Sequence, residues 1–212
     1  MKIIKGTLKG RNIICPPHIR PVSLRVKKAC FDILKGEIEG RRVLDLFAGS
    51  GSLGIEALSC GAKQAIFIDI EGECIETIKK NLTSLKLVLE AEVYPIRKIP
   101  CGLPQSKYFS TGAGFNSPEF SNGVYLKDVF RAVEDFAALG EKFDLIFLDP
   151  PYYKGMIKKF LQTLEEYDIL TAPGFLIGFC YVKDDVLMDS NRFSLILEKK
   201  YGQNLLLIYR KK

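Results

Sequence analysis

The sequence has little of what metal-binding and exported proteins usually contain. It has one histidine, His18, and its cysteines form no C-x-x-C pair, so a zinc site is not expected. Scattered cysteines of this kind are typical of reduced thiols in a cytoplasmic protein. No apolar run reaches the length of a signal peptide or of a membrane-spanning helix, so we expect neither export nor membrane insertion.

Charge is distributed unevenly along the chain. The 212 residues are 47% hydrophobic and 26% charged, which is typical of a soluble globular domain with its own core. The net charge of +6 comes from the first 42 residues, which hold eleven Lys or Arg against three Asp or Glu. A basic amino-terminal segment on a nearly neutral body indicates an acidic polymer as partner. A solvated charged surface explains the same pattern equally well, so charge alone does not decide.

The amino-terminal segment has the pattern of a hairpin followed by a helix. Residues 1–16, MKIIKGTLKGRNIICP, place two short apolar runs around a basic turn that contains glycine. Apolar residues recur at helical spacing between Val26 and Leu34, and Ser23 can cap the start of this helix. The other face of the helix is expected to be basic and carries Arg25, Lys27, Lys28 and Lys35.

Strand and helix patterns alternate through the rest of the chain. Strands are expected at residues 41–48, 64–70, 91–96, 143–149 and 174–182, and helices at 52–62, 71–86 and 154–167. This alternation predicts an α/β fold with a mostly parallel sheet covered by helices on both faces. Residues 193–212 predict a closing hairpin around Gly202, which makes one edge antiparallel. Residues 97–123 are rich in Gly, Pro, Ser and Asn, and we interpret them as a loop insertion.

A glycine-rich turn follows the first of these strands, in VLDLFAGSGSLGIEAL. Gly49 and Gly51 let the backbone pass close to a ligand, and Gly54 permits tight packing of helix on strand. Asp69 ends the next strand, where a carboxylate can accept hydrogen bonds from both hydroxyls of a ribose. The pattern therefore predicts a nucleotide-like cofactor at the carboxyl ends of the strands.

Asp45 bears on which cofactor this is. It lies within the strand, four residues before Gly49, and its charge would repel a pyrophosphate. The sulfonium and amino groups of S-adenosylmethionine would instead be attracted. Charge therefore favours the methyl donor over NAD, although the glycine spacing also satisfies the dinucleotide fingerprint. An NAD-dependent enzyme and a purely structural turn stay open as alternatives.

A second motif, FDLIFLDPPYYKG, follows another buried strand. Two prolines cannot extend a strand, so Pro150 and Pro151 fix a stiff loop at its end. The loop holds a carboxylate (Asp149), a rigid carbonyl oxygen (Pro150) and an aromatic ring (Tyr152) close together. Two acceptors aimed at an exocyclic amine make it a better nucleophile, and a carboxylate stabilises the charge that develops on it.

These stretches resemble the S-adenosylmethionine-dependent methyltransferases. LDLFAGSGSLGIEALSCGA is similar to their first cofactor motif, and LIFLDPPY to the D/N-P-P-Y/F motif of enzymes that methylate amino groups of nucleic-acid bases. KIIKGTLKGRNIICPP and RPVSLRVKKACFDIL resemble the amino-terminal segment of the RsmD-type family. Members of that family are bacterial methyltransferases of guanine N2 in small-subunit ribosomal RNA. The similarity extends to the closing EKKYGQNLLLIYRKK.

The resemblance implies a Rossmann-like class I methyltransferase with a seven-stranded sheet and S-adenosylmethionine as its cofactor. It further implies 16S ribosomal RNA or the 30S subunit as partner, and a basic extension (residues 1–40) before a methyltransferase domain (41–212). This chain departs from the family at Val22, where threonine is usual, and at Cys180, where an acid is common. No heptad seam is visible in the sequence, so we expect a monomer.

The resemblance also implies roles for individual residues. Those expected to line the cofactor are Asp45, Phe47, Gly49, Gly51, Asp69 and Asp128. Those expected to act on the amine are Asp149, Pro150, Pro151 and Tyr152. Those expected to contact RNA phosphates are Lys5, Lys9, Arg11, Arg20, Arg25, Lys27 and Lys28. The same chemistry serves adenine N6 and cytosine N4, and a non-catalytic RNA-binding or ribosome-assembly factor is a third alternative.

Overall fold

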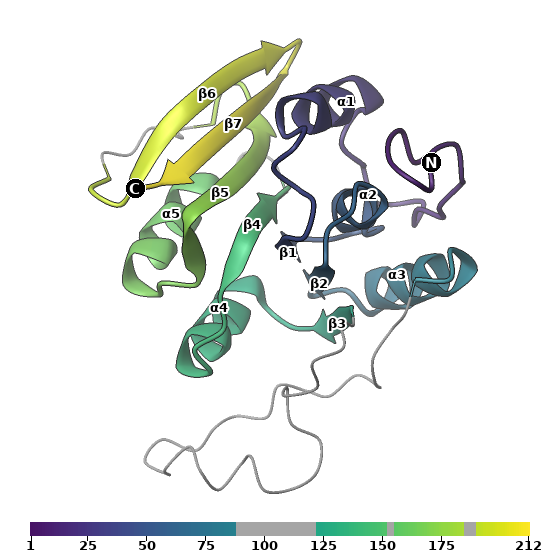
Figure 1. The fold of residues 1–212 in the computed structure, drawn as a ribbon, viewed down its shortest axis with the longest axis horizontal. Coiled ribbons are helices and arrows are strands. Elements are labelled where there is room, and N and C mark those ends of the chain that lie inside the picture. The colour runs from purple at the N-terminus through teal and green to yellow at the C-terminus, as the bar shows by residue number, and fades with distance from the viewer. Residues whose placement is uncertain (88–121, 152–154, 185–189) are drawn as a thin grey trace, which may run out of the picture.

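The fold is built on one sheet of seven strands. They are β1 (Arg42–Leu46), β2 (Gln64–Asp69), β3 (Gly123–Leu126), β4 (Phe143–Leu148), β5 (Leu170–Tyr181), β6 (Phe193–Tyr201) and β7 (Asn204–Lys211). The order across the sheet is β3-β2-β1-β4-β5-β7-β6 (Figure 1). Neighbours among β1 to β5 are parallel, and β7 is antiparallel to β5 and β6, as predicted. The structure is a computed structural model that describes residues 1–87, 122–151, 155–184 and 190–212.

Helices cover both faces of the sheet and divide the core into two layers. They are α1 (Leu24–Ile33), α2 (Ser52–Ser59), α3 (Gly72–Ser84), α4 (Val129–Ala138) and α5 (Met156–Glu166). Helices α1, α2 and α3 cover one face of the sheet, and α4 and α5 cover the other (Figure 1). Their apolar side chains pack in two clusters, one on each face. None of the helices in the described ranges is long and apolar enough to cross a membrane.

The central strands are apolar on both faces because both faces are covered. In β1, Val43 and Leu44 point to opposite clusters, and each is fully buried. In β4, Leu145 and Ile146 alternate in the same way. Continuous apolar runs of this kind are typical of buried parallel strands. Strand β1 pairs with β2 on one side and with β4 on the other, so the loops that follow these strands share one edge of the sheet.

Local signals set the helix ends. The Ser23 hydroxyl accepts a hydrogen bond from the Val26 N–H and caps α1, as expected. Gly61 follows the end of α2 with φ at +93°, a conformation that favours glycine. Asp128 caps α4 by accepting from the N–H groups of Phe130 and Arg131.

Three of the described elements differ from the sequence expectation. The third strand is β3 at Gly123–Leu126, so the proposed insertion does not extend to residue 123. The strand expected at 91–96 and most of the insertion (97–121) lie outside the described residues. Helix α4 was not expected, although its buried residues Val129, Ala132, Val133 and Phe136 recur at helical spacing. Strand β5 also begins earlier, at Leu170, where it pairs with Phe143.

The amino-terminal arm, defined here as residues 1–22, packs into the first core layer. Its expected hairpin has one antiparallel bridge, between Lys2 and Asn12, within a turn closed by main-chain hydrogen bonds. Ile3 and Ile13 are buried in the cluster shared with α1, α2 and α3. The arm is therefore part of the same core as the sheet.

Candidate active site

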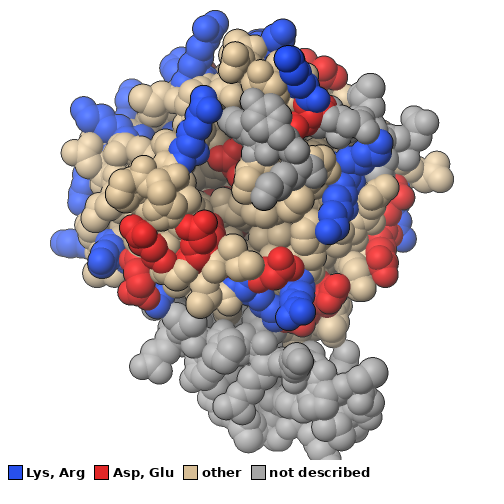
Figure 2. Space-filling model, turned by 180° about the vertical axis from the view of Figure 1, so that it is seen from behind, with Lys and Arg blue, Asp and Glu red and all other residues tan. Residues whose placement is uncertain are grey.

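A cavity of about 350 Å³ opens where β1, β2 and β4 end. Ligands of open α/β sheets bind at this edge, and the volume suits a small molecule. Figure 2 shows a hollow near the centre of the face seen from behind, with acidic side chains in it. The strand ends contribute Asp45, Phe47, Ala48, Gly49, Ser50, Asp69, Ile70, Glu71, Asp149, Pro150 and Pro151. The start of α2 and the arm add Ser52, Leu53, His18, Ile19, Arg20, Pro21 and Val22.

Asp69 fixes the shape of the loop after β1. Its Oδ2 accepts a hydrogen bond from the Gly49 N–H at 2.8 Å, and its Oδ1 accepts from the Glu71 N–H at 2.9 Å. Each carboxylate oxygen keeps further acceptor capacity. Asp69 therefore ties two cavity-lining loops together and still borders the cavity, as the cofactor motif predicts.

The glycines of the loop have different roles. Gly54 donates its N–H to Asp45 Oδ2 at 2.9 Å, and a Cβ there would lie 2.4 Å from a ring carbon of Phe67. This confirms the expected tight packing of helix on strand. Gly49 borders the cavity, but Gly51 is not among its lining residues. The φ of Gly51 is +75°, and its missing Cβ leaves room for Ile78 and core neighbours, so its conformation requires glycine and its cofactor contact stays a prediction.

Asp45 is a buried carboxylate with one oxygen available to a ligand. Its side chain is 1% exposed, and among the described residues Oδ1 has no hydrogen-bond partner. Burial raises the pKa of Asp45 well above its ordinary value, and the charges of Asp149 and Asp69 add to the rise. A cation in the cavity would offset that penalty, so the site favours a positively charged ligand.

Asp149 begins the turn that follows β4. Burial raises the pKa of this carboxyl to about 7. Pro150, next to it, is buried, and both prolines border the cavity beside the carboxylate. The structure therefore brings Asp149, Pro150 and Pro151 to the same cavity as the cofactor motif. Tyr152 lies outside the described residues.

Phe47 has a strained backbone at the edge of the cavity. Its φ is +58°, which is unusual for a bulky residue and costs about 1–3 kcal/mol. The ring is partly buried against the second core layer and borders the cavity. Strain of this kind gathers at ligand sites, which agrees with the role expected for Phe47.

Asp128 does not line this cavity. Its Oδ1 accepts the hydrogen bonds that cap α4, so the carboxylate has a structural partner. The cap uses Oδ1, and the contact of Asp128 with the cofactor stays a prediction.

The arm supplies lining residues that the sequence did not suggest. His18 Nε2 lies 2.7 Å from Glu71 Oε2, which joins the arm to the β2–α3 loop across the cavity mouth. Ile70, directly after Asp69, is 67% exposed and offers an apolar surface beside the carboxylate. The position of Ile70 after a strand-ending acid could have been recognised in the sequence, whereas no neighbouring residues indicate that His18 lines the cavity.

His18, Glu71 and Cys74 are the described residues whose potential metal-binding atoms lie within 4.8 Å of one another. Cys74 is buried, and burial together with nearby acids raises the pKa of its thiol to about 12. The contact between His18 and Glu71 is explained without a metal, so we assign no metal to this cluster.

The basic residues of the amino-terminal region fall into three groups. Lys9, Arg11, Arg20, Arg25 and Lys28 are exposed, and Arg20 also borders the cavity. Lys5 is partly exposed and bonds to Asp32 and to the Phe31 carbonyl oxygen. Lys27 is 0% exposed, and its Nζ lies 2.8 Å from Glu56 Oε2. The expected phosphate contact of Lys27 is therefore wrong, because the side chain points into the core.

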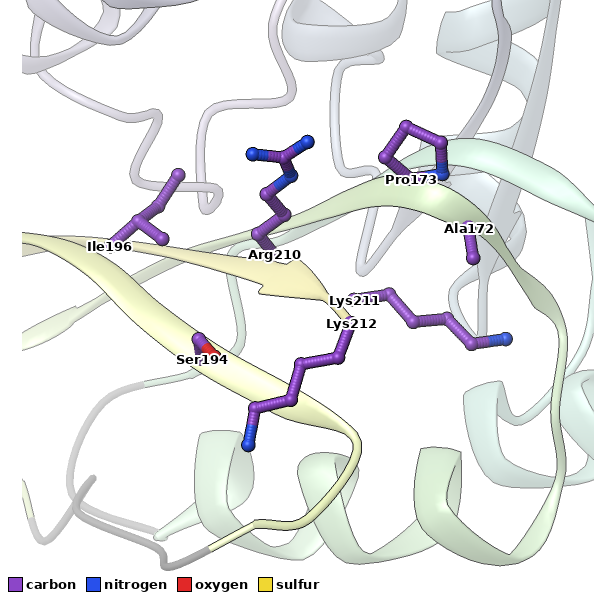
Figure 3. A pocket seen from close by; sticks show the side chains of 7 residues that line it. All are labelled: Ala172, Pro173, Ser194, Ile196, Arg210, Lys211 and Lys212. Carbon is purple, nitrogen blue, oxygen red and sulfur yellow. The ribbon is translucent and has the colours of Figure 1, made fainter.

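A second hollow lies at the opposite edge of the sheet, between β5, β6 and β7 (Figure 3). Its lining includes Arg210, Lys211, Lys212 and the exposed Ile196. Lys211 Nζ bonds to Asp168 and to the Leu170 carbonyl oxygen, so that amine has a structural role. Among the described residues, no side-chain carboxylate, imidazole or thiol lines this hollow, so we place the candidate chemistry at the first cavity.

Known proteins resemble this chain along its full length. YlbH of Bacillus subtilis is 32% identical over 216 residues, which cover 100% of both chains. Ribosomal RNA small subunit methyltransferase D of Haemophilus influenzae is 31% identical over 205 residues, covering 95% of this chain and 89% of that protein. The solved structure of yhhF from Escherichia coli has a TM-score of 0.74 at 24% identity, covering 100% of this chain and 98% of that chain.

The family described as Conserved hypothetical protein 95 matches residues 1–99 and 114–210. These ranges include the arm, the glycine-rich loop, the Asp149–Pro151 turn and the closing hairpin. The fold agrees, since the TM-score of 0.74 with the yhhF structure covers the whole chain. The chain therefore belongs to the Conserved hypothetical protein 95 family, the RsmD-type family of methyltransferases.

Proposed function

We propose that this protein transfers a methyl group from S-adenosylmethionine to the exocyclic N2 amine of a guanine in 16S ribosomal RNA. One observation carries the proposal: Asp149 and Pro150 border the same cavity as the glycine-rich loop and Asp69. A cofactor in that loop and an amine at that turn would therefore meet. Family membership favours methyl transfer over the NAD-dependent alternative.

The residues of the cavity fit S-adenosylmethionine. Asp45 and Asp149 suit its sulfonium and amino groups, and Asp69 has acceptor capacity for ribose hydroxyls. Ile70 and Phe47 give apolar surface for the adenine ring. When bound, the cofactor supplies an electrophilic methyl group on a positively charged sulfur. A pyrophosphate would meet three carboxylates here, which disfavours a dinucleotide.

Asp149 and the Pro150 carbonyl oxygen would hold the amine. They accept hydrogen bonds from its two hydrogens and draw the nitrogen lone pair out of the ring. As the nitrogen bonds to the methyl carbon and the bond from that carbon to sulfur breaks, the positive charge would pass to the nitrogen beside the Asp149 carboxylate. The surplus proton then passes from the nitrogen to Asp149 or to solvent. Tyr152, at the end of the motif, would stack on the base.

The exposed cations of the first 28 residues would bind the RNA backbone. Lys9, Arg11, Arg25 and Lys28 are exposed, and Arg20 stands at the cavity itself. Contacts of this kind position a nucleic acid without reading its sequence. A paired guanine hides its amine, so the target base is unpaired or flipped out. We place the enzyme in the cytoplasm, acting as a monomer on 16S RNA or the 30S subunit.

A tritium-transfer assay tests the proposal. Purified protein and labelled S-adenosylmethionine are incubated with 30S subunits, naked 16S RNA and plasmid DNA from cells that lack the native enzyme. Nucleosides from each labelled polymer are then separated and identified by mass spectrometry. We expect label as N2-methylguanosine in 16S RNA, and the sample that carries it defines the assembly state required.

Other outcomes decide against the proposed substrate. Label in adenine N6 or cytosine N4 would assign the protein to the rival amino-methylating class. Asp149→Ala should remove turnover and leave RNA binding intact. If that variant methylates at the wild-type rate, Asp149 is not the catalytic carboxylate. If wild-type protein binds RNA and cofactor and labels nothing, the assembly-factor alternative gains.

A further inference from the structure

One buried amide joins the arm to the cofactor loop. Asn81 lies on α3 and is 1% exposed. Its Oδ1 accepts from the Ile14 N–H at 2.7 Å, and its Nδ2 donates to the Ile14 carbonyl oxygen at 2.9 Å. The same Nδ2 donates to the Ser50 carbonyl oxygen at 3.0 Å. Both donors of the amide are therefore used, and they reach segments that lie 36 residues apart in the sequence.

The two joined segments meet again at the cavity. Ser50 follows Gly49 in the cofactor loop, and both border the cavity. Downstream of Ile14, the arm supplies the cavity wall from His18 to Val22. A Cβ on Gly49 would lie 3.1 Å from the Ile19 side chain, so wall and loop are in direct contact. A shift of the arm at Ile14 would therefore displace the cofactor loop.

Further polar contacts hold the arm to α2, but they lie farther along the helix. Glu56 accepts from the N–H groups of Ile4 and Lys5, and Ser59 binds the main chain near Gly6. These anchors fix the start of the arm. The Ser50 hydroxyl also reaches Met1 Sδ at 3.8 Å, but a thioether is a weak acceptor, so the Asn81 amide makes the stronger link between the arm and the cofactor loop.

We propose that Asn81 is a positioning residue that holds the arm and the cofactor loop in one fixed relation, so that cofactor and RNA strengthen each other's binding. The part that concerns RNA rests on the proposed function. A cofactor bound in the loop would restrict the motion of Ser50. Because Asn81 is hydrogen-bonded to both Ser50 and Ile14, the motion of Ile14 would also be restricted, and the arm residues that face the RNA would be held in place. By linkage, bound RNA must then raise cofactor affinity by the same factor.

Two variants of buried asparagines separate positioning from general stability. Asn81→Asp keeps the oxygen that accepts from the Ile14 N–H. It loses the hydrogen bonds to the carbonyl oxygens of Ile14 and Ser50, and its second carboxylate oxygen repels both carbonyl oxygens. Asn122→Ala is the matched control, because Asn122 is 6% exposed and accepts from the Ala65 N–H at the start of β2, away from the cavity. Melting temperature establishes that each variant folds.

Calorimetry gives the dissociation constant for S-adenosylmethionine, and fluorescence anisotropy gives that for a 16S RNA fragment with and without S-adenosylhomocysteine. For wild type we expect RNA to bind roughly 5-fold tighter when S-adenosylhomocysteine is present, which is at the lower end of the usual coupling between two binding sites. Asn81→Asp should lose that coupling and bind the cofactor roughly 10-fold more weakly, about 1.4 kcal/mol. Asn122→Ala should lower the melting temperature while it keeps both properties.

The outcomes differ for the two claims. If folded Asn81→Asp retains wild-type cofactor affinity and coupling, the inference is overturned. It is also overturned if Asn122→Ala weakens the cofactor as much, because the effect is then general destabilisation, or if wild type binds RNA without coupling. If wild type binds no RNA while Asn81→Asp selectively weakens the cofactor, the positioning role stands and the proposed substrate is wrong.

Discussion

At the scale of single residues, Asp149 shows how its surroundings prepare a carboxyl group for chemistry. An ordinary aspartate is ionised at neutral pH and is too weak a base to take a proton. Burial at the end of β4 raises the pKa of Asp149 to about 7, close to the value that suits proton transfer in the cell. The same burial favours the protonated form of the carboxyl in the free protein.

Methyl transfer should follow the ionisation of Asp149. We expect the rate under limiting substrate to rise about tenfold per pH unit below pH 7 and to level off above it. Asp149→Asn keeps the shape and removes the base, so its rate should be at least roughly 100-fold lower and nearly independent of pH. A single-turnover pH profile of both proteins measures this. A wild-type profile that is flat from pH 5 to 8 would show that another group limits the reaction.

The same group makes the free protein less stable as pH rises. The folded pKa lies above the unfolded one, so the folded state binds the proton more tightly. Stability from this group is full below about pH 4 and is lost as pH rises to about 7. We therefore expect Asp149→Asn to melt roughly 5 °C higher than wild type at pH 8 and at nearly the same temperature at pH 4.

Gly54 is required for the contact between α2 and β2. A methyl group there would lie 2.4 Å from Phe67 and near the Asp45 carboxylate. We expect Gly54→Ala to lower the free energy of unfolding by about 1–3 kcal/mol and to weaken cofactor binding. Gly72→Ala is the control, since Gly72 begins α3 and a Cβ there meets nothing within 4 Å. Urea titration compares the two, and equal stabilities would contradict the packing argument.

At the scale of elements, α1 presents two adjacent lysines to opposite environments. Lys27 is buried against Glu56, whereas Lys28 is exposed and lies 3.4 Å from Asp32. The sequence gives both the same charge and places both beside apolar neighbours. Only the packing of α1 on α2 decides which lysine faces solvent. Charge on a helix therefore predicts a nucleic-acid surface only after the buried face is known.

This pair allows a matched test of stability against RNA binding. Lys27→Met leaves Glu56 buried without its cation, so we expect it to lower the free energy of unfolding by about 3–5 kcal/mol. Lys28→Met should change stability by less than about 0.5 kcal/mol, since exposed pairs contribute little, and should weaken RNA binding. Denaturant titration and anisotropy give both quantities. A Lys27 variant of wild-type stability would show that the pair is not needed for the fold.

Much of the fold could be predicted at this scale, and the exceptions have physical causes. Strand and helix periods identify β1, β2, β4, α2, α3 and α5, because long buried segments carry strong apolar patterns. Strand β3 has four residues, too few for a period to show. Helix α4 carries a clear apolar period, but our prediction did not include it. Lys27 was given an RNA contact because a charge pattern records residue types and not the directions of side chains.

At the scale of the whole molecule, the site could be predicted only in part. The two motifs place Asp45, Asp69 and Asp149 at strand ends, and a parallel sheet brings strand ends to one edge. The arm's contribution could not be foreseen, because His18 meets Glu71 across 53 residues of sequence. Contacts between residues so far apart in the sequence depend on how the arm packs, and no local sequence pattern predicts that packing.

RNA binding by the whole surface should depend steeply on salt. Each phosphate neutralised by a cation releases counterions, so the logarithm of affinity falls linearly with the logarithm of salt concentration. Removing one phosphate contact, as in Lys9→Ala or Arg11→Ala, should reduce that slope by about 0.7 for single-stranded RNA. Lys79→Ala on α3, where Lys79 pairs with Glu76, is the control. An unchanged slope in the arm variants would remove those residues from the RNA interface.

The order of strands in the sheet also governs how the chain folds during synthesis. Strand β1 pairs with β2 soon after both leave the ribosome, but its other edge must wait for β4, which begins about 100 residues later. The Arg42 N–H reaches Asp144 across that interval. A nascent chain therefore presents an unpaired, apolar strand edge for several seconds at ordinary elongation rates. Such an intermediate is a natural client for chaperones, and slowing elongation between residues 70 and 143 should lower the yield of folded protein.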